Sequence, residues 1–153
     1  MKLSIIRHAQ AIDFGTLAFD DARQLTEKGI KQSQSIGEYL LEAGQVPEIV
    51  LSSPTLRAKQ TAEILCQSAG MSEPLLASFL SCGMRPEVAL SELKSYAGLA
   101  HVALVGHEPD LSYLLARLMG VHELQFQVKK ASLSILDGQF IHGEWKLLEC
   151  VKF

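Results

Sequence analysis

Two histidines and two arginines in this sequence could together bind and attack a phosphoryl group. Arg7 and His8 are adjacent, Arg57 follows a Ser-Ser-Pro segment, and His107 follows a glycine. The arginine guanidinium offers a planar fork of donors that matches phosphate oxygens. A neutral imidazole is a nucleophile, and neighbouring positive charges keep it neutral by lowering its pKa. His8 could therefore attack phosphorus while the other three side chains hold the phosphate oxygens.

The segments that carry these side chains follow predicted strands. Short apolar runs at residues 3–6, 48–51 and 101–105 predict buried strands that end directly before the polar clusters. The carboxyl ends of such strands form the ligand-binding edge of a parallel α/β sheet. We therefore expect the clusters to meet at one edge, although they lie far apart in the sequence.

Helices are predicted between and after these strands. Thr26 is the expected N-cap of a helix that runs to about residue 43, and a second helix is expected to start at Ser53-Pro54 and to end near residue 68. Two more helices are expected at residues 86–96 and 109–119. This alternation predicts a three-layer α/β/α sandwich with a mostly parallel central sheet.

The remaining segments complete the expected fold. Residues 9–24 are mixed and acidic and are expected to form a loop, while residues 71–85 are irregular with a short strand near residues 75–77. The last 25 residues alternate in polarity and contain Asp137-Gly138, which predicts antiparallel strands at the sheet edge.

Composition indicates one domain over residues 1–153 and excludes several classes of function. The chain is 48% hydrophobic and 20% charged, enough for a buried core, and its net charge of −3 does not favour nucleic-acid binding. Its three cysteines are widely spaced, which favours neither a zinc site nor a redox motif and fits a reducing, cytoplasmic compartment. The N-terminal apolar run is too short for a signal peptide or a membrane span.

Other routes to phosphate chemistry lack their sequence motifs. The sequence has no Gly-x-x-x-x-Gly-Lys-Ser/Thr loop, no Asp-x-Asp pair, and no cysteine followed six residues later by arginine. His-Glu-x-x-His is also absent, and a strand would separate His101 from His107 too widely for both to bind one metal ion. We therefore expect neither a metal nor a cofactor.

Four segments, in order along the chain, carry a family resemblance. They are residues 3–9 (LSIIRHA), 23–29 (RQLTEKG), 52–62 (SSPTLRAKQTA) and 105–111 (VGHEPDL). They resemble the signature segments of the histidine phosphatase superfamily, except that Ala9 stands where the first segment of the family has glycine. The resemblance implies a phosphoglycerate-mutase-like fold. Residue by residue, it implies that His8 is the nucleophile and that Arg7, Arg57 and His107 form the phosphate pocket, without a metal.

The short chain is similar to the SixA-type phosphohistidine phosphatases within that superfamily. This likeness implies a metal-independent phosphatase with a covalent phosphohistidine intermediate and a phosphohistidine-bearing phosphotransfer protein as substrate. Two alternatives stay open: a phosphomonoesterase for a small phosphorylated metabolite, and a phosphate-binding module without turnover. We expect neither a nucleic-acid nor a membrane partner.

The sequence leaves open which residue of the predicted site donates the proton. Many relatives have a carboxylate in the segment that corresponds to residues 79–84, and this chain has none there. Glu108 directly follows His107 and is one candidate; the other possibility is that no acid is needed, because imidazole leaves more readily than an alkoxide. Arg23 either borders the phosphate pocket or pairs with Asp20 or Asp21. Arg7 could likewise be a structural ion-pair partner of Asp13 or Asp110.

Overall fold

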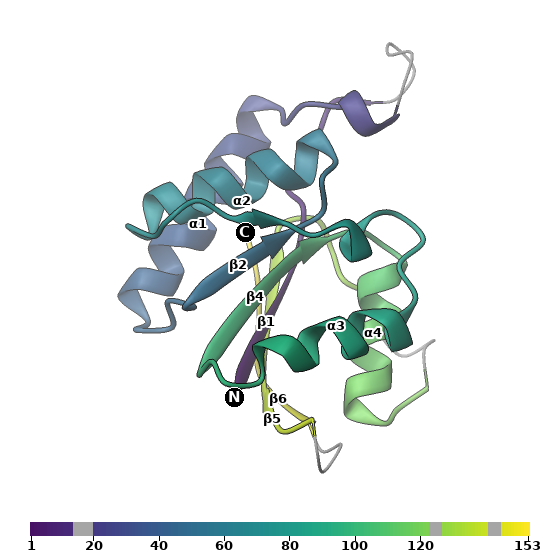
Figure 1. The fold of residues 1–153 in the computed structure, drawn as a ribbon. Coiled ribbons are helices and arrows are strands. Elements are labelled where there is room, and N and C mark those ends of the chain that lie inside the picture. The colour runs from purple at the N-terminus through teal and green to yellow at the C-terminus, as the bar shows by residue number, and fades with distance from the viewer. Residues whose placement is uncertain (14–19, 123–126, 141–144) are drawn as a thin grey trace.

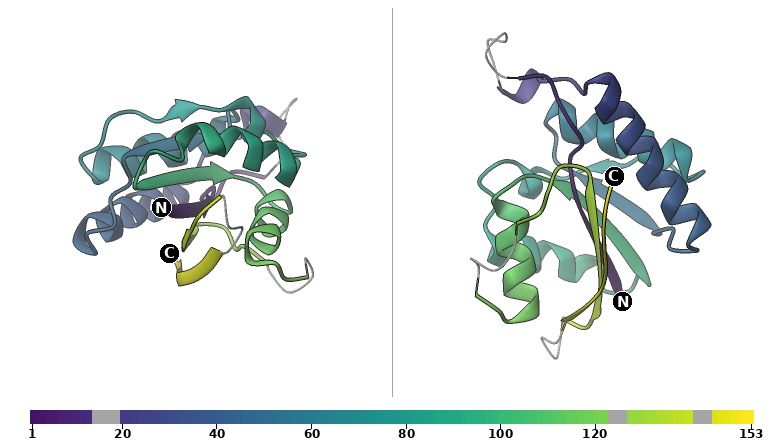
Figure 2. Two further views of the ribbon diagram at one scale, coloured as in Figure 1. Left: turned by 60° about the horizontal axis from the view of Figure 1, so that its bottom comes forward. Right: turned by 180° about the vertical axis from the view of Figure 1, so that it is seen from behind.

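A six-stranded sheet forms the centre of the molecule, with the strand order β3-β2-β4-β1-β5-β6. The computed structural model describes residues 1–13, 20–122, 127–140 and 145–153. Four strands run parallel: β1 (Lys2–Arg7), β2 (Ile49–Ser52), β3 (Leu75–Leu76) and β4 (His101–Gly106). At one edge β5 (Ser132–Gly138) and β6 (Trp145–Lys152) run antiparallel, and Figure 2 shows them beside β1. The mostly parallel sheet with antiparallel edge strands is therefore confirmed.

Helices cover both faces of this sheet. Figure 1 shows α1 (Glu27–Glu42) and α2 (Leu56–Ser68) on one side and α3 (Pro86–Leu93) and α4 (Asp110–Met119) on the other. The side chains of β1 alternate between two apolar clusters, since Leu3 and Ile5 pack with the α3 and α4 layer whereas Ile6 packs with the α1 and α2 layer. Both faces of the strand are thus buried, which explains its continuous apolar run. The predicted three-layer α/β/α sandwich is confirmed.

The start of α1 and the end of α4 are as expected, whereas the start of α2 is wrong and α3 ends at Leu93, before the expected residue 96, because the chain continues there as a 3₁₀ turn. The Thr26 hydroxyl accepts a hydrogen bond from the Gly29 amide at 3.1 Å and caps α1, and Gly120 ends α4 with φ of 65°. The second helix, however, starts at Leu56 with Thr55 as its N-cap, and not at Ser53-Pro54. The physical reason is that Ser53 is still held to the sheet, because its amide donates to the carbonyl oxygen of Val105 at 2.9 Å, while its hydroxyl lies 2.8 Å from His107 Nε2.

The connecting segments hold short 3₁₀ turns. Within the expected loop of residues 9–24, Asp20–Ala22 form such a turn, Ala11 bridges Leu25, and residues 14–19 lie outside the described part. A second turn, Ser78–Leu80, follows β3, and a third, Lys94–Tyr96, follows α3. In the described part of the chain, no helix is both long and apolar enough to cross a membrane.

Candidate active site

The carboxyl ends of β1, β2 and β4 border one pocket of about 350 Å³. The sheet register explains the convergence, because Arg7 pairs with Gly106 and Ser52 pairs with Val105 at neighbouring strand ends. This pocket is lined by all six site residues that were selected from the sequence and by three other residues. The lining residues are Arg7, His8, Asp20, Arg23, Arg57, Cys82, His107, Glu108 and Lys130.

Hydrogen bonds fix the tautomer of His8 at the centre of this pocket. Its Nδ1 lies 2.8 Å from the carbonyl oxygen of Ala9, and because a carbonyl only accepts, Nδ1 carries the proton. The Nε2 atom therefore holds a lone pair, which accepts a hydrogen bond from Arg57 Nε at 3.3 Å. The geometry leaves Nε2 as the ring nitrogen whose lone pair lies in the pocket.

The surroundings of His8 keep its ring neutral. Burial is the largest effect and lowers the pKa of His8 to about 3, and the charges of His107, Arg57 and Arg7 act in the same direction. The hydrogen bond to the Ala9 carbonyl opposes this shift but is weaker than burial. At neutral pH the side chain is thus a free base, which nucleophilic attack requires.

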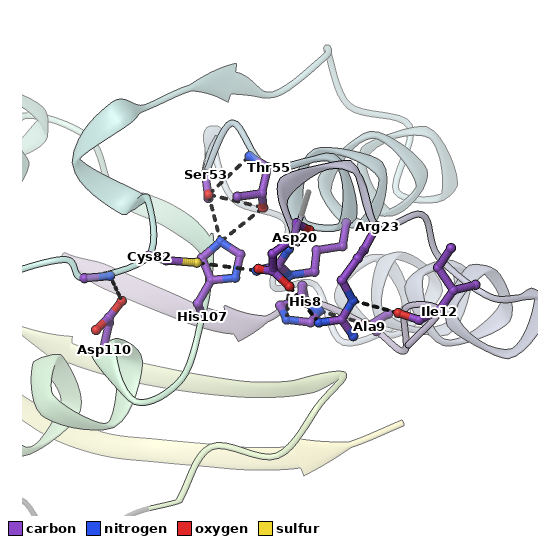
Figure 3. A network of polar contacts seen from close by, with 12 residues as sticks. His8, Ala9, Ile12, Asp20, Arg23, Ser53, Thr55, Cys82, His107 and Asp110 are labelled. Atoms are coloured by element: carbon purple, nitrogen blue, oxygen red, sulfur yellow. Dashed lines mark hydrogen bonds and ion pairs between the residues drawn. The ribbon is translucent and has the colours of Figure 1, made fainter. Parts of the chain in front are cut away.

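His107 lies beside His8, and the centroids of the two rings are 5.2 Å apart. Its Nε2 atom is hydrogen-bonded to Ser53 Oγ at 2.8 Å and to Thr55 Oγ1 at 3.1 Å, so the residues that lead into α2 orient the ring (Figure 3). Burial lowers the pKa of His107 to about 4, and the nearby Arg57 adds to this shift. When one of these hydroxyls donates to Nε2, the Nδ1 atom bears the proton and can donate a hydrogen bond.

Arg57 comes from the first turn of α2 and is almost fully buried. Its guanidinium donates to the backbone and the carboxylate of Asp20 at 2.8 and 2.9 Å, and to Cys82 Sγ at 3.4 Å. The same carboxylate accepts a hydrogen bond from Arg23 at 3.1 Å. Desolvation raises the pKa of Asp20, but the two arginines outweigh it and the pKa lies below its usual value. Asp20 is therefore charged and holds both arginines at the pocket.

Three buried polar atoms of the pocket have no hydrogen-bond partner among the described residues. They are Arg7 Nε, His107 Nδ1 and Glu108 Oε1. Buried polar groups in proteins are nearly always paired, so a cluster of unpaired ones marks a place where a polar ligand binds. Two of the three belong to side chains selected from the sequence as phosphate ligands.

Arg7 and Glu108 are further fixed by neighbouring groups. Arg7 donates to the carbonyl oxygen of Val128 at 2.8 Å, and Glu108 Oε2 accepts from the Ser112 hydroxyl at 2.7 Å. Asp110, one carboxylate that could have paired with Arg7, instead accepts hydrogen bonds from the amides of Gly83 and Met84. Burial raises the pKa of Glu108, although the Ser112 hydrogen bond opposes the shift.

Side chains of the third signature segment join the parts of the site. The Thr61 hydroxyl accepts from the amide of Ala9 at 3.1 Å, directly after His8, and Gln60 Oε1 accepts from the amide of Leu25 at 2.9 Å. Both residues stand on the same helix as Arg57. The segment thus attaches α2 to the chain next to His8 and also carries Arg57 into the pocket.

Sequence reasoning missed three contributors to this site. Ser53 was expected to cap a helix, and Asp20 was expected only as a partner of Arg23. Lys130 was expected in a solvated loop pair with Lys129, with contact to phosphate as the less favoured alternative, yet all three contact or line the site. Of these three residues, the sequence contains a signal only for Ser53, which belongs to a signature segment. For Arg23 both expectations are correct, since it lines the pocket and also pairs with Asp20.

Over the described residues, no group of three or more His, Cys, Asp or Glu side chains is placed to hold a metal ion.

Comparisons with known proteins agree with this geometry. Residues 3–77 match the model of the histidine phosphatase superfamily, branch 1. The phosphohistidine phosphatase SixA of Escherichia coli (strain K12) is 36% identical over 124 residues, which cover 77% of this chain and 74% of that protein.

Two solved structures share the fold over nearly the whole chain. The protein histidine phosphatase SixA complexed with tungstate superposes with a TM-score of 0.90 at 24% identity, covering 99% of this chain and 97% of that one. The alpha-ribazole phosphatase from Shigella flexneri has a TM-score of 0.77 at 20% identity, covering 96% and 94%. The sequence relative, the family match and the shared fold together show that this chain belongs to the histidine phosphatase superfamily.

Proposed function

We propose that this protein is a metal-independent phosphatase that removes phosphate from phosphohistidine in a protein and carries it transiently on His8. The observation that carries the proposal is the fixed tautomer of His8. Its Nδ1 is bound to the Ala9 carbonyl, so its Nε2 lone pair lies in a pocket with three arginines. Such a nitrogen is the kind of group that attacks an anionic phosphoryl group.

In the first step His8 Nε2 forms a bond to phosphorus as the bond from phosphorus to the substrate imidazole breaks. Arg7 Nε and His107 Nδ1, both unpaired in the structure, each donate to a phosphate oxygen. Arg57 donates to the remaining oxygen from its position beside His8 Nε2. These donors stabilise the charge on the transferred group, which is the main requirement of phosphoryl transfer.

Glu108 is the proposed acid and base of the two steps. Its pKa is raised, chiefly by burial, which favours a protonated carboxyl that can supply a proton to the leaving group. In the second step a water molecule attacks phosphorus, Glu108 takes up the proton of the water, and His8 departs as a neutral imidazole. Because an imidazole needs little help to leave, a donor of modest strength suits a phosphohistidine substrate better than an alkyl phosphate.

A small phosphorylated metabolite is the second candidate substrate. The pocket of about 350 Å³ has room for an organic group beside the phosphate. The alpha-ribazole phosphatase, whose name denotes a small substrate, shares the fold of this chain. Fold likeness does not determine the substrate, so the two candidates must be compared directly.

The deciding experiment compares phosphate release from a phosphohistidine-bearing phosphotransfer protein and from p-nitrophenyl phosphate, with EDTA present. Wild type should release phosphate from both, favour the protein, and yield a phosphoenzyme whose label is lost in acid but is stable in base, as a phosphoramidate is. His8→Ala should abolish release and labelling.

Each other outcome has a definite meaning. A preference for small substrates would favour the metabolite phosphatase. Tight phosphate binding without release from any substrate would indicate a binding module. Equal release by wild type and His8→Ala would refute His8 as the nucleophile.

A further inference from the structure

A second hollow adjoins the candidate active site and is lined by basic side chains. It has a volume of about 400 Å³ and shares Arg7 and Lys130 with the active-site pocket. Lys28, Lys129 and Lys152 also line it. We call the four lysines, Lys28, Lys129, Lys130 and Lys152, the basic surface.

Three separate parts of the chain bring these lysines together. Lys28 stands in the first turn of α1, Lys129 and Lys130 precede β5, and Lys152 ends β6. Backbone hydrogen bonds hold these segments beside the nucleophile, since the Ala131 amide donates to the carbonyl oxygen of His8 at 3.3 Å and the Phe153 amide donates to that of Ala131 at 3.0 Å. The position of the basic surface relative to His8 is thus set by the fold.

Charge is distributed very unevenly between this region and the rest of the molecule. Of the 14 basic residues in the chain, seven line the two hollows: Arg7, Arg23, Lys28, Arg57, Lys129, Lys130 and Lys152. Among the acidic residues that the structure describes, two do so: Asp20 and Glu108. An overall acidic protein therefore presents a local positive field around its candidate active site, which attracts anionic partners.

The lysines of the basic surface are available for a partner. Lys28, Lys129 and Lys152 are exposed, and none of the four lysines takes part in an ion pair within the described residues. By contrast, Arg57 is buried and held in a fixed geometry. The buried arginine suits directional binding of the transferred phosphoryl group, whereas exposed ammonium groups on flexible stems adapt to a broad, irregular acidic surface.

We propose that the basic surface docks an acidic face of a protein substrate, with carboxylates next to the phosphohistidine that enters the active site. This proposal rests on the proposed function, because it names the kind of protein that the phosphatase accepts. The individual contacts are weak because they are exposed. Together the contacts guide the substrate to the active site and orient it. We therefore expect them to affect KM and its dependence on salt concentration.

The test uses three synthetic phosphohistidine peptides of equal length, with glutamate, alanine or lysine residues around the phosphohistidine. Wild type should prefer the acidic peptide through a lower KM, and the preference should shrink as salt is raised. In Lys28→Glu/Lys152→Glu, kcat/KM for the acidic peptide should fall by about tenfold or more, because attraction becomes repulsion. Hydrolysis of p-nitrophenyl phosphate should stay unchanged, since neither lysine lines the active-site pocket.

A matched control separates the basic surface from the overall charge. Lys94→Glu/Lys146→Glu makes the same change of charge at exposed lysines, one after α3 and one at the far end of β6 from Lys152. It should retain the wild-type preference. An equal fall in this control, or equal use of all three peptides by wild type, would overturn the proposal while leaving the proposed function intact.

Failure of the proposed function would look different. If p-nitrophenyl phosphate is hydrolysed but no phosphohistidine peptide is, the unphosphorylated acidic peptide is tested as an inhibitor. Inhibition of wild type that weakens in Lys28→Glu/Lys152→Glu supports the docking surface alone, and no inhibition overturns it. A preference for 3-phosphoglycerate over glycerol 3-phosphate that is lost in this variant would assign the surface to the carboxylate of a small phosphorylated metabolite and also overturn the proposal.

Discussion

At the scale of single residues, hydroxyl and carbonyl groups outside the catalytic set decide what the two histidines can do. The Ala9 carbonyl fixes the proton of His8 on Nδ1, and the Ser53 and Thr55 hydroxyls hold Nε2 of His107. These contacts leave one nitrogen of each ring available to a phosphoryl group. We therefore expect the positioning groups to matter to activity although they need not touch the substrate.

Ser53→Ala tests this positioning role. The variant removes the 2.8 Å contact to His107 and leaves its ring held by Thr55 alone. We expect kcat/KM for p-nitrophenyl phosphate to fall by about 10- to 100-fold, in line with roughly 1–3 kcal/mol for an unpaired buried polar group. Ser53→Thr, which keeps the hydroxyl, should restore much of the loss.

The neighbouring serine provides the control. Ser52 is equally buried, but its hydroxyl donates to a backbone carbonyl and does not contact His107. Steady-state kinetics on Ser52→Ala should therefore stay close to wild type when corrected for the folded fraction. A similar loss in both variants would show that Ser53 acts through stability and not through His107.

Glu108 should determine how activity on poor leaving groups depends on pH. Its pKa is raised, and the acid role needs the protonated form, so activity on an alkyl phosphate should fall as pH rises through that pKa. The neutral form of His8 is lost only as pH falls towards about 3, far from this range. Glu108→Gln should remove this alkaline fall and lower alkyl phosphate turnover more than that of p-nitrophenyl phosphate, whose leaving group needs no proton. Equal losses on both substrates across pH 4–9 would contradict the assignment.

At the scale of elements, two glycines of α1 show how helix packing supports the site. A Cβ atom on Gly29 would lie 2.0 Å from the carbonyl oxygen of Gln10, two residues after His8. A Cβ atom on Gly37 would lie 2.4 Å from the carbonyl oxygen of Leu65, at the crossing of α1 and α2. Glycine is required at both places because backbone approaches backbone, and Gly29 belongs to a signature segment for this reason.

Gly29→Ala and Gly37→Ala can be compared to separate an effect on the active site from an effect on stability. Both should lower the free energy of unfolding, because each clash outweighs the helix propensity gained, which is about 1 kcal/mol. Urea unfolding measures this loss. Activity per folded molecule should fall only in Gly29→Ala, because only that clash displaces the chain next to His8. An equal loss of specific activity in Gly37→Ala would show that α1 does not act on the site locally.

The helix ends are predicted correctly where neighbouring residues determine them. They are predicted wrongly where contacts between distant residues determine them. The Thr26 cap and the Gly120 end follow from local preferences and are correct. The start of α2 was placed two residues too early. Ser53 followed by proline is a good local start signal, but the Ser53 amide is bonded to β4, and its hydroxyl contacts His107, which lies 54 residues away. No local pattern contains that contact.

At the scale of the whole molecule, the position of the pocket can be predicted from the order of the strands. The hydrogen bonds between the side chains of the pocket cannot. Neighbouring parallel strands place the ends of β1, β2 and β4 at one edge, so the convergence of His8, Arg57 and His107 follows from the strand pattern. The link from Asp20 to Arg57 depends on how a loop folds back over the sheet, which strand and helix periodicity does not encode. The roles of the site residues stay predictions until the variants are measured.

The buried histidines should make the whole fold sensitive to mild acid. Burial lowers the pKa of His8 to about 3 and those of His101 and His107 to about 4, against 6.5 for an unperturbed histidine. Between these values the unfolded chain binds more protons than the folded one, so stability is complete above pH 6.5 and is lost as pH falls towards 4. The raised pKa of Glu108 acts in the opposite direction for a single group.

His101 is the histidine on which this acid sensitivity can be tested without touching the active site. It is buried, with Nε2 2.8 Å from Ser4 Oγ, and lies at the opposite end of β4 from His107. In His101→Gln, the slope of the unfolding free energy between pH 6 and 5 should decrease by up to about 1.4 kcal/mol per pH unit, whatever the stability at pH 7.5. An unchanged slope in His101→Gln would mean that this histidine is already protonated in the folded protein, and that its burial does not contribute to acid unfolding.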